Sequence, residues 1–541
     1  MVSFKCQALA MLIAQASVVA QESSLRASVS RKLSFESIAG YTPGSQVTDH
    51  NAIDLDQQEI EVQLSDGTDD SISIARAVYE EGAFSKSYAK VKLTTPLSSK
   101  LNKGDKIKGK NADGKDVNGK ALKTFESGVR DIEVQYSTTD IQDSYVGCQV
   151  GALALAGKEV TEGCFATEGT FIIGSDTYEY TYDVKTQNKN ARTIQGFSTA
   201  AGSKMAGYVD FEKFKTYYGV SDYADQWVLA AFDKERTNFN NGDANFGLYG
   251  LAGQKEVIKK GTAYMNIWMY VVREFEDALD DCNDGCINCN DDPVHAWDEG
   301  VAFYTGSLEG NDGAGDGKLL YGLADKRCQN YKTCGTDGEE ASGTSKINYD
   351  LMQQFAVGQQ NLVLGNCIQA RVDKERIVEL MAVPLVQGTI RYAYKVGEVP
   401  TSGEKEAAEG AVFAAAVLPI VHACNKADAQ TIYNNMKVGA SSTDYLAVKK
   451  AFENNYSCMG ITCKDVGGLW DSANGKYYAN SSPCKDSSTS SSDSNALAIS
   501  LGTVAGVVTV AAVGFFLYLR KREIAGTPVW EPAKEIQGES S

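Results

Sequence analysis

The chain reads YMNIWMYVVREFEDALDDCNDGCINCNDDPVHAWDEGVAFYTGSLE at residues 264–309. This stretch predicts a long helix, a short loop holding three cysteines, and a second helix that starts near His295. On a helical projection, one narrow stripe of the first helix gathers four polar side chains: Tyr270, Glu274, Asp277 and Asp281. An apolar stripe lies opposite, made of Met265, Trp268, Val272, Phe275 and Leu279. The pattern predicts a helical hairpin with a polar face.

The second helix adds the remaining polar groups of this hairpin. His295 and Glu299 share one face, and Asp298 flanks it. The apolar seam on the other side comprises Trp297, Val301, Tyr304 and Leu308. Carboxylates, phenols and one of only three histidines therefore fall within one hairpin. The pattern Glu-Gly-x-x-Phe of Glu299–Phe303 recurs at Glu409–Phe413, which is either a faint internal repeat or a coincidence.

Three interpretations compete for His295, Asp298 and Glu299. The first is a solvated helix start, because acidic residues in a first turn stabilise the helix dipole by about 0.3–1 kcal/mol. The second is a metal site, because a histidine and carboxylates three and four residues later reach one ion from one helical face. The third is a metallopeptidase. The sequence His-Ala-Trp-Asp-Glu lacks the second histidine of the zinc signature, so hydrolysis is disfavoured.

A metal site here would draw its ligands from both helices. The candidate ligands are His295, Asp298, Glu299, Glu274, Asp277, Tyr270 and Asp281. Carboxylate and phenolate oxygens are hard donors, and the scarcity of histidine makes zinc or copper less natural. Fe(III) fits this donor set better than magnesium, which keeps its waters. Calcium remains possible in the loop 311–316, although that loop lacks EF-hand spacing.

Composition and cysteine usage bound the class of protein. A net charge of −18 over 541 residues argues against nucleic acid as a partner, because phosphates need a basic surface. Thirteen cysteines are present, of which Cys6 lies in the leader described next. The other twelve allow up to six disulfides in an oxidising compartment, with pairing left open.

Both ends of the chain predict a membrane topology. Residues 1–20 have the pattern of a secretory signal peptide. Residues 496–519 form an apolar run long enough to cross a bilayer, and the basic residues 520–522 after it place that end in the cytoplasm. A Ser/Thr-rich stalk at 485–495 and a cytoplasmic tail at 520–541 complete a single-pass type I protein. The sequons at Asn455 and Asn480 predict a glycoprotein.

The part between leader and stalk predicts an α+β fold. Residues 21–200 are β-rich, with strands expected at 60–64, 132–136, 170–173 and 178–182 that form a sandwich or an irregular sheet. Residues 205–484 have helical periodicity and predict a bundle. Its helices are expected at 209–217, 221–233, 253–281, 294–309, 347–395 with a break at Pro384, 404–424, 427–437 and 443–455.

Two sequence blocks carry a resemblance to a known family. They are HAWDEGVAFYTGS at residues 295–307 and LLYGLADKRC at residues 319–328. With these blocks the chain resembles the algal phytotransferrins, the iron-starvation-induced iron-assimilation proteins that carry a Fea-like domain. The resemblance covers mainly residues 209–465. The element His-x-x-(Asp/Glu) is also similar to imelysin-like helical bundles.

The resemblance implies a non-enzymatic surface receptor. It implies high-affinity binding of ferric iron with carbonate as a synergistic anion, at the plasma membrane, followed by endocytosis through endosomes. The cytoplasmic tail would then contact endocytic adaptors. The family pattern assigns no ligand by position, so the candidate ligands above rest on helix geometry. The alternatives are a cell-surface adhesion or interaction protein with a solvated acidic hairpin and, less favoured, an imelysin-like metallopeptidase.

Overall fold

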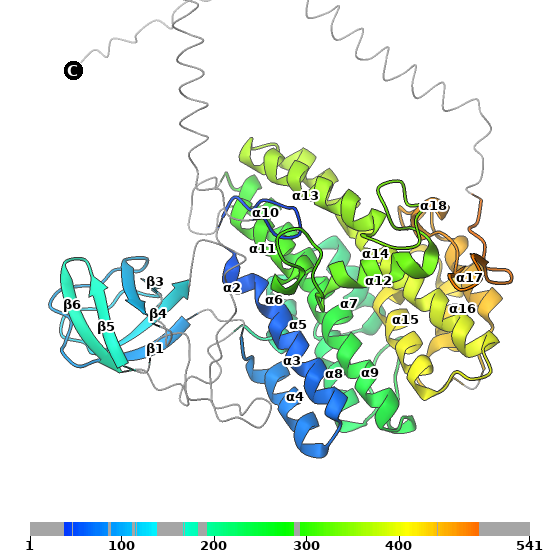
Figure 1. The fold of residues 1–541 in the computed structure, drawn as a ribbon, viewed down its shortest axis with the longest axis horizontal. Coiled ribbons are helices and arrows are strands. Elements are labelled where there is room, and N and C mark those ends of the chain that lie inside the picture. The colour runs from blue at the N-terminus through cyan, green and yellow to red at the C-terminus, as the bar shows by residue number, and fades with distance from the viewer. Residues whose placement is uncertain are drawn as a thin grey trace, which may run out of the picture. The chain divides into compact units, whose positions relative to one another are not determined.

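The computed structural model describes most of the chain between Ser37 and Lys485. The described residues are 37–45, 47–84, 88–110, 114, 116–137, 166, 168–181, 192–285, 293–440 and 442–485. The predicted leader, transmembrane segment and tail, all of the stalk but its first residue, and the cysteines at 148, 164, 286 and 289 lie outside these residues. The described part is an α+β structure with a β-barrel and a helical bundle, each with its own hydrophobic core (Figure 1).

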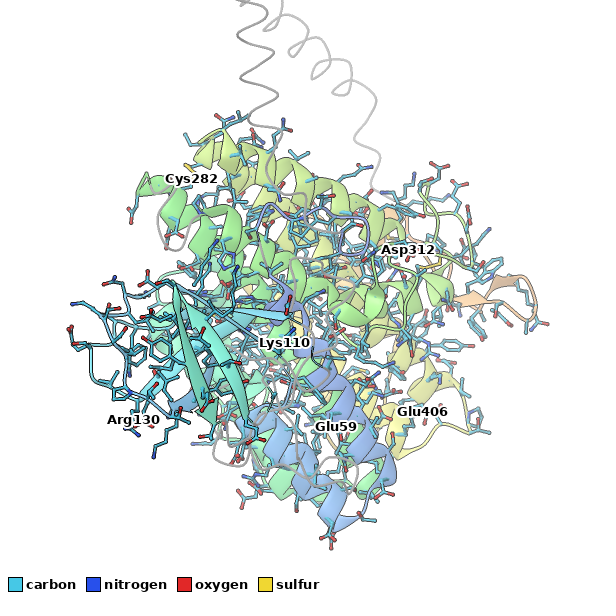
Figure 2. The ribbon with its side chains drawn as sticks, turned by 60° about the vertical axis from the view of Figure 1, so that its left-hand side comes forward. Glu59, Lys110, Arg130, Cys282, Asp312 and Glu406 are labelled. Carbon is cyan, nitrogen blue, oxygen red and sulfur yellow. A yellow bond between two sulfur atoms is a disulfide. The ribbon has the colours of Figure 1, made fainter. Side chains whose placement is uncertain are left out.

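Six antiparallel strands form the closed barrel, in the order β1-β4-β3-β2-β5-β6. They are β1 Tyr88–Leu93, β2 Lys106–Lys110, β3 Asp116–Ala121, β4 Asp131–Ser137, β5 Glu168–Ile173 and β6 Asp176–Thr181. Alternate residues face inward: Val91 is opposite Ile132, and Phe171 is opposite Tyr178. Figure 2 shows Lys110 and Arg130 on this barrel. Three of the predicted strands are confirmed in it, and a closed barrel replaces the expected sandwich.

The fourth predicted strand, residues 60–64, is wrong. These residues lie in helix α3 (Ile53–Asp66), between α2 (Thr48–Asn51) and α4 (Asp69–Glu81). Ile60 and Leu64 are four residues apart and both buried, so they share one helical face, while Val62 is 51 % exposed. Alternating apolar residues fit a helix as well as a strand here. Gly67, with φ +73°, ends α3, and Thr68 caps α4 through Ser71 N–H.

Helices are the main elements of the remaining described chain. They are α5 Ile194–Thr199, α6 Ala201–Lys204, α7 Val209–Tyr218, α8 Tyr223–Asp233, α9 Leu251–Gly261, α10 Trp268–Asn283, α11 Pro293–Thr305, α12 Leu320–Tyr331, α13 Lys346–Val363, α14 Cys367–Glu398, α15 Glu404–Cys424, α16 Lys426–Met436, α17 Tyr445–Glu453 and α18 Cys463–Val466. One π-helical turn, η4 (Thr262–Ile267), joins α9 to α10, and short 3₁₀ turns η3 (Phe246–Leu248) and η5 (Ser307–Glu309) precede α9 and follow α11. A small hairpin, β7 Trp470–Asp471 and β8 Lys476–Tyr477, follows α18.

The expected break at Pro384 is wrong, because α14 continues through this residue. The long predicted helix 347–395 is instead divided between α13 and α14. Gly365 has φ +71° there, a left-handed conformation that ends a helix readily only at glycine. Pro384 itself is buried inside α14, where the packing of neighbouring helices holds it.

Four disulfides join cysteines of the described bundle. Two close short loops, Cys328–Cys334 and Cys463–Cys484. Cys282–Cys367 joins α10 to α14, and Cys424–Cys458 joins the end of α15 to the turn that follows α17. The expectation of disulfides is therefore confirmed for eight cysteines. One described helix, α15, is long and apolar enough to span a membrane by length and composition, and most of it is buried in the bundle.

Candidate functional site

Helices α10 and α11 pack closely as the predicted hairpin. A methyl group added at Gly300 would lie 2.7 Å from the ring of Phe275, so glycine is needed for this approach. The Phe275 and Trp297 rings are 4.5 Å apart, and the indole N–H of Trp297 donates to the carbonyl oxygen of Phe355. This apolar contact fixes the angle and rotation of α11, and therefore the direction of its polar face.

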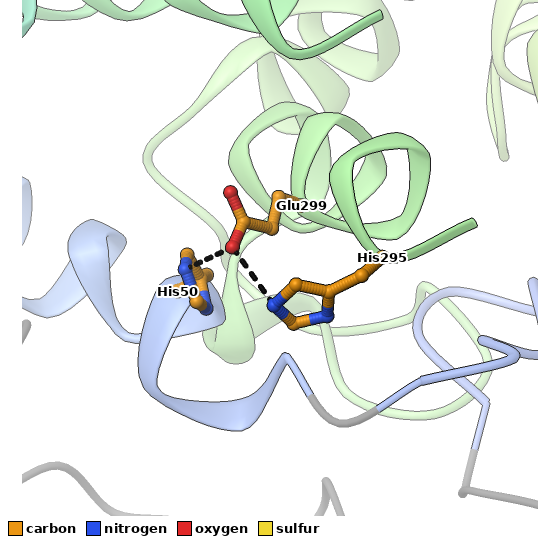
Figure 3. A group of neighbouring side chains, drawn as sticks. All are labelled: His50, His295 and Glu299. Atoms are coloured by element: carbon orange, nitrogen blue, oxygen red, sulfur yellow. Dashed lines mark ion pairs between the residues drawn. The ribbon is translucent and has the colours of Figure 1, made fainter. Parts of the chain in front are cut away.

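Three side chains converge where that polar face meets the N-terminal segment. Glu299 Oε1 lies 2.5 Å from His50 Nε2 and 3.1 Å from His295 Nε2 (Figure 3). One ligand atom from each residue lies within 4.8 Å of the others, which is close enough for the three side chains to bind one metal ion. His50 is almost fully buried, and the side chains of His295 and Glu299 are 29 % and 15 % exposed. The cluster is thus open on one side.

Asp298 acts beside this cluster rather than in it. Its Oδ1 accepts hydrogen bonds from Tyr41 Oη and Gln359 Nε2, and its Oδ2 accepts from the backbone N–H groups of Gly44 and Ser45. Burial raises the pKa of Asp298 to about 6, although these hydrogen bonds favour its charged form. Asp298 therefore holds the 41–45 loop against α11, and this loop leads into the short helix that carries His50.

Ser45 connects Asp298 to His295. Its hydroxyl donates to Asp298 Oδ2 at 2.8 Å and lies 3.0 Å from His295 Nδ1. Because the single hydroxyl hydrogen is used on Asp298, Ser45 accepts from Nδ1–H of His295. His295 therefore carries a proton on Nδ1, and its Nε2 points toward Glu299. In metal sites, a hydrogen bond to the other ring nitrogen fixes the tautomer of a histidine ligand in the same way.

Glu274 supplies a second carboxylate close to Glu299. It is 1 % exposed and pairs with the neighbouring Arg273, which also bonds Asp277 at 2.9 Å. Burial, and then the negative charge of Glu299, raise the pKa of Glu274 to about 8. The positive charge of His50 and contacts with both histidines hold the pKa of Glu299 well below its usual range. Glu299 is therefore the carboxylate that carries the charge, and Glu274 loses its proton only at a higher pH.

Three cationic side chains, Lys204, Arg273 and Arg192, lie near Tyr270 or its aromatic neighbours. The Tyr270 ring stacks on Phe197 at 3.8 Å, and its hydroxyl lies 3.4 Å from Lys204 Nζ. Arg273 lies 5.7 Å from the Tyr270 ring, and Arg192 lies 5.6 Å from the ring of Phe303. Burial, and then the charges of Arg273 and Arg192, lower the pKa of Lys204. Positive charge is therefore concentrated next to the Glu274–Glu299 pair.

The structure brings some predicted site residues together and separates others. His295 and Glu299 belong to the cluster, and Glu274 and Tyr270 lie close enough to interact electrostatically with Glu299. Asp277 is held by Arg273. Asp281 lies about 10 Å further along α10 than Glu274, beside the Cys282–Cys367 disulfide. Asp277 and Asp281 are outside the three-residue cluster.

His50 was missed by sequence reasoning, which placed this segment in the β-rich region 21–200 and assigned it no role. Its neighbours Thr48-Asp49-His50-Asn51 form no recognisable metal motif. The available signal was rarity: the chain has three histidines, and two of them meet at Glu299. The third, His422, packs against Tyr217 in another part of the bundle.

The fold and site therefore define a disulfide-linked helical bundle with a His-His-Glu cluster of the kind that binds transition metals. Residues 241–484 match the model of the Fea1 family, described as low iron-inducible periplasmic protein. The predicted Fea-like domain is thus confirmed over these residues, and the match is consistent with an iron-related role. The match includes Glu274, His295 and Glu299, whereas His50 precedes it. No curated protein and no solved structure matches the chain.

Proposed function

We propose that this chain captures ferric iron at the His50–His295–Glu299 cluster and serves high-affinity iron uptake. The observation that supports the proposal most directly is the meeting of two of three histidines on one carboxylate, from segments far apart in sequence. In the metal-free protein, contacts with the two histidines balance the charge of Glu299. An iron ion between the same three groups would replace those contacts.

The donor set suits iron. Two imidazoles and one carboxylate are the donor set of non-haem Fe(II) sites, and they leave coordination positions open for the hard oxygen donors that Fe(III) favours. Glu274 interacts electrostatically with Glu299, and its ionisation would supply a second negative charge toward a trivalent ion. Tyr270 is a candidate phenolate, since a ferric ion favours the deprotonated oxygen. Zinc uses similar donors, so iron is favoured here by the family description together with the site.

An anion has a place next to this cluster. Lys204 and Arg273 place positive charge beside Glu274 and Glu299, and Arg192 interacts electrostatically with Lys204. We propose that carbonate, held by these cations, fills the open coordination positions. A planar dianion would match the arginine guanidinium groups through bidentate hydrogen bonds.

Binding rather than catalysis is the proposed role. An enzyme needs open positions for its substrate, whereas the bound anion would occupy them here. The imelysin-like metallopeptidase would require peptide hydrolysis by the iron- or zinc-loaded protein. The adhesion alternative requires no metal at all, and would leave the cluster as a structural ion-pair network.

The proposed location is the cell surface. The family description names a periplasmic protein, and the disulfides of the bundle suit an oxidising compartment. The sequence adds the leader, the apolar segment 496–519 and the basic residues after it. We propose a type I plasma-membrane protein that is internalised by endocytosis through adaptors of its cytoplasmic tail.

Ferric titration of the purified protein in competition with a chelator, with and without bicarbonate, tests this function. The wild type should bind one ferric ion, more tightly with bicarbonate, and His50→Ala should weaken binding at least a hundredfold. Glu409→Gln is the matched control, because Glu409 occupies the same sequence pattern but pairs with Lys260 at 2.7 Å. Equal affinity of His50→Ala and wild type would refute the site. Absence of tight ferric binding by the wild type would refute the function.

A further inference from the structure

A second carboxylate stands out in the segment that follows α11. Glu309 ends the turn η5 and is 1 % exposed. Its Oε1 is buried, and within the described part of the chain no hydrogen-bond donor reaches it. A buried carboxylate oxygen without a donor is costly, because it has lost its water and gained no partner.

The charges around Glu309 are mostly of its own sign. Burial, and then repulsion from Asp325 and Asp54, raise the pKa of Glu309 to about 8. Asp54 is itself fully buried and accepts hydrogen bonds from Ser307 Oγ and Leu308 N–H. Lys326 is the cation that favours the charged form of Glu309, but it is 55 % exposed and lies 3.8 Å from Asp316. The surroundings of Glu309 therefore hold more buried negative charge than Lys326 balances.

A backbone oxygen faces the same point as the Glu309 carboxylate. A methyl group added at Gly322 would lie 2.6 Å from the carbonyl oxygen of Gly317 and 2.9 Å from Glu309 Oε1. Glycine at positions 317 and 322 therefore lets a carboxylate and a carbonyl approach the start of α12 together. Carboxylate and carbonyl oxygens are the ligands that Ca²⁺ prefers in proteins, at 2.3–2.6 Å.

We propose that Glu309, the Gly317 carbonyl and the neighbouring Asp325 together bind a divalent cation of the calcium type. Glu309 would be the anionic anchor, since its Oε1 has no other partner, and Asp325 would add charge. The Gly- and Asp-rich loop before Gly317, in which Figure 2 labels Asp312, leads from Glu309 to this carbonyl, and Gly315 N–H in it donates to the Glu309 carbonyl oxygen at 3.1 Å. Calcium is favoured over magnesium because a carbonyl and irregularly placed carboxylates suit its flexible coordination.

The alternative explanation for the unpaired Glu309 Oε1 is that the carboxyl group is protonated and therefore neutral. The two explanations differ in their response to metal. A neutral acid gains nothing from calcium, whereas a cation site becomes more stable by mass action as calcium is added. The proposed calcium ligands share no residue with the His50–His295–Glu299 cluster, so the calcium proposal can be tested independently of iron binding.

Calorimetric titration of the full-length, iron-free protein with CaCl2 tests the proposal. The wild type should bind one Ca²⁺, and its thermal midpoint should rise with calcium. Glu309→Gln keeps the shape of the side chain and should weaken Ca²⁺ binding at least tenfold. Glu339→Gln, at an exposed position, is the control and should bind as the wild type does. Glu299→Gln should also retain Ca²⁺ binding.

Three results would overturn the proposal. The first is no Ca²⁺ uptake by the wild type at millimolar concentrations. The second is equal affinity of wild type and Glu309→Gln, which would place the ion elsewhere. The third is tighter binding of Mg²⁺ than of Ca²⁺, which would exclude a site of the calcium type. Circular dichroism and the calcium-free thermal midpoint show whether Glu309→Gln is folded, so a loss of binding can be assigned to the carboxylate.

Discussion

Ser45 connects Asp298, which holds the 41–45 loop in place, to the proposed ligand His295. Its hydroxyl joins Asp298 to His295, and Asp298 fixes the loop that leads to His50. Sequence analysis placed Asp298 among the ligands because it shares a helix turn with His295 and Glu299. The structure shows why spacing alone misleads: both carboxylate oxygens of Asp298 already accept hydrogen bonds from the 41–45 loop or from Gln359. Such outer partners orient ligands without touching the ion.

We expect Ser45→Ala to weaken ferric binding by about tenfold to a hundredfold, because His295 loses the acceptor that fixes its tautomer. The free energy of unfolding should fall by only about 1 kcal/mol, the value of a typical hydrogen bond. Chelator competition and urea unfolding measure the two effects. Ser73→Ala, at an exposed position of α4, serves as the control. Unchanged ferric affinity in Ser45→Ala would contradict the role given to this hydroxyl.

Glu309 also predicts a pH dependence of stability. Its pKa is raised from the model-peptide value of 4.5 to about 8 in the folded protein, so the folded state holds the proton more tightly than the unfolded state. Its contribution to stability is therefore fully present below about pH 4.5 and is lost as the pH rises toward 8. In calcium-free buffer, Glu309→Gln should make the free energy of unfolding less dependent on pH over this range. A parallel pH profile for variant and wild type would contradict the buried, proton-binding state of Glu309.

At the scale of secondary-structure elements, the hairpin α10–α11 could be predicted and the N-terminal helices could not. The polar and apolar stripes of residues 264–309 give the right helices, and α15 has the predicted bounds of Glu404–Cys424. The prediction for segment 60–64 failed because Ile60 and Leu64 fit both the strand and the helix period, and only tertiary packing selects the helix. His50 could not be assigned because its partners are brought to it by the fold, through Tyr41 and the 41–45 loop.

The contact between α10 and α11 depends on Gly300. In Gly300→Ala the new methyl group would lie 2.7 Å from the Phe275 ring, so the helices must separate or Phe275 must move. We expect a loss of about 1–3 kcal/mol in the free energy of unfolding, as for other overpacked cores, together with weaker ferric binding. Gly403→Ala is the matched control, because nothing lies within 4 Å of the added methyl group. Chemical denaturation of the two variants measures the difference, and equal stabilities would contradict the close packing.

At the scale of the whole molecule, the two predicted sequons differ in their surroundings. Asn455 is 3 % exposed, and its amide donates to Asp428 Oδ2 and to the carbonyl oxygen of Ala451. Asn480 is exposed. We expect a glycan at Asn480 and none at Asn455, because a sugar at Asn455 is incompatible with the folded bundle. Mass spectrometry of peptides from the cell-expressed protein measures both occupancies, and a high occupancy at Asn455 would contradict the described packing.

At the proposed site, two histidines distant in sequence, His50 and His295, bind one iron ion. X-ray absorption at the iron K-edge of the ferric-loaded, full-length protein tests it most directly, because imidazole rings give a characteristic multiple-scattering signal. We predict two imidazole ligands in the wild type and one in His50→Ala, with oxygen donors in the remaining positions. A wild-type spectrum without imidazole, or one that His50→Ala leaves unchanged, would contradict it.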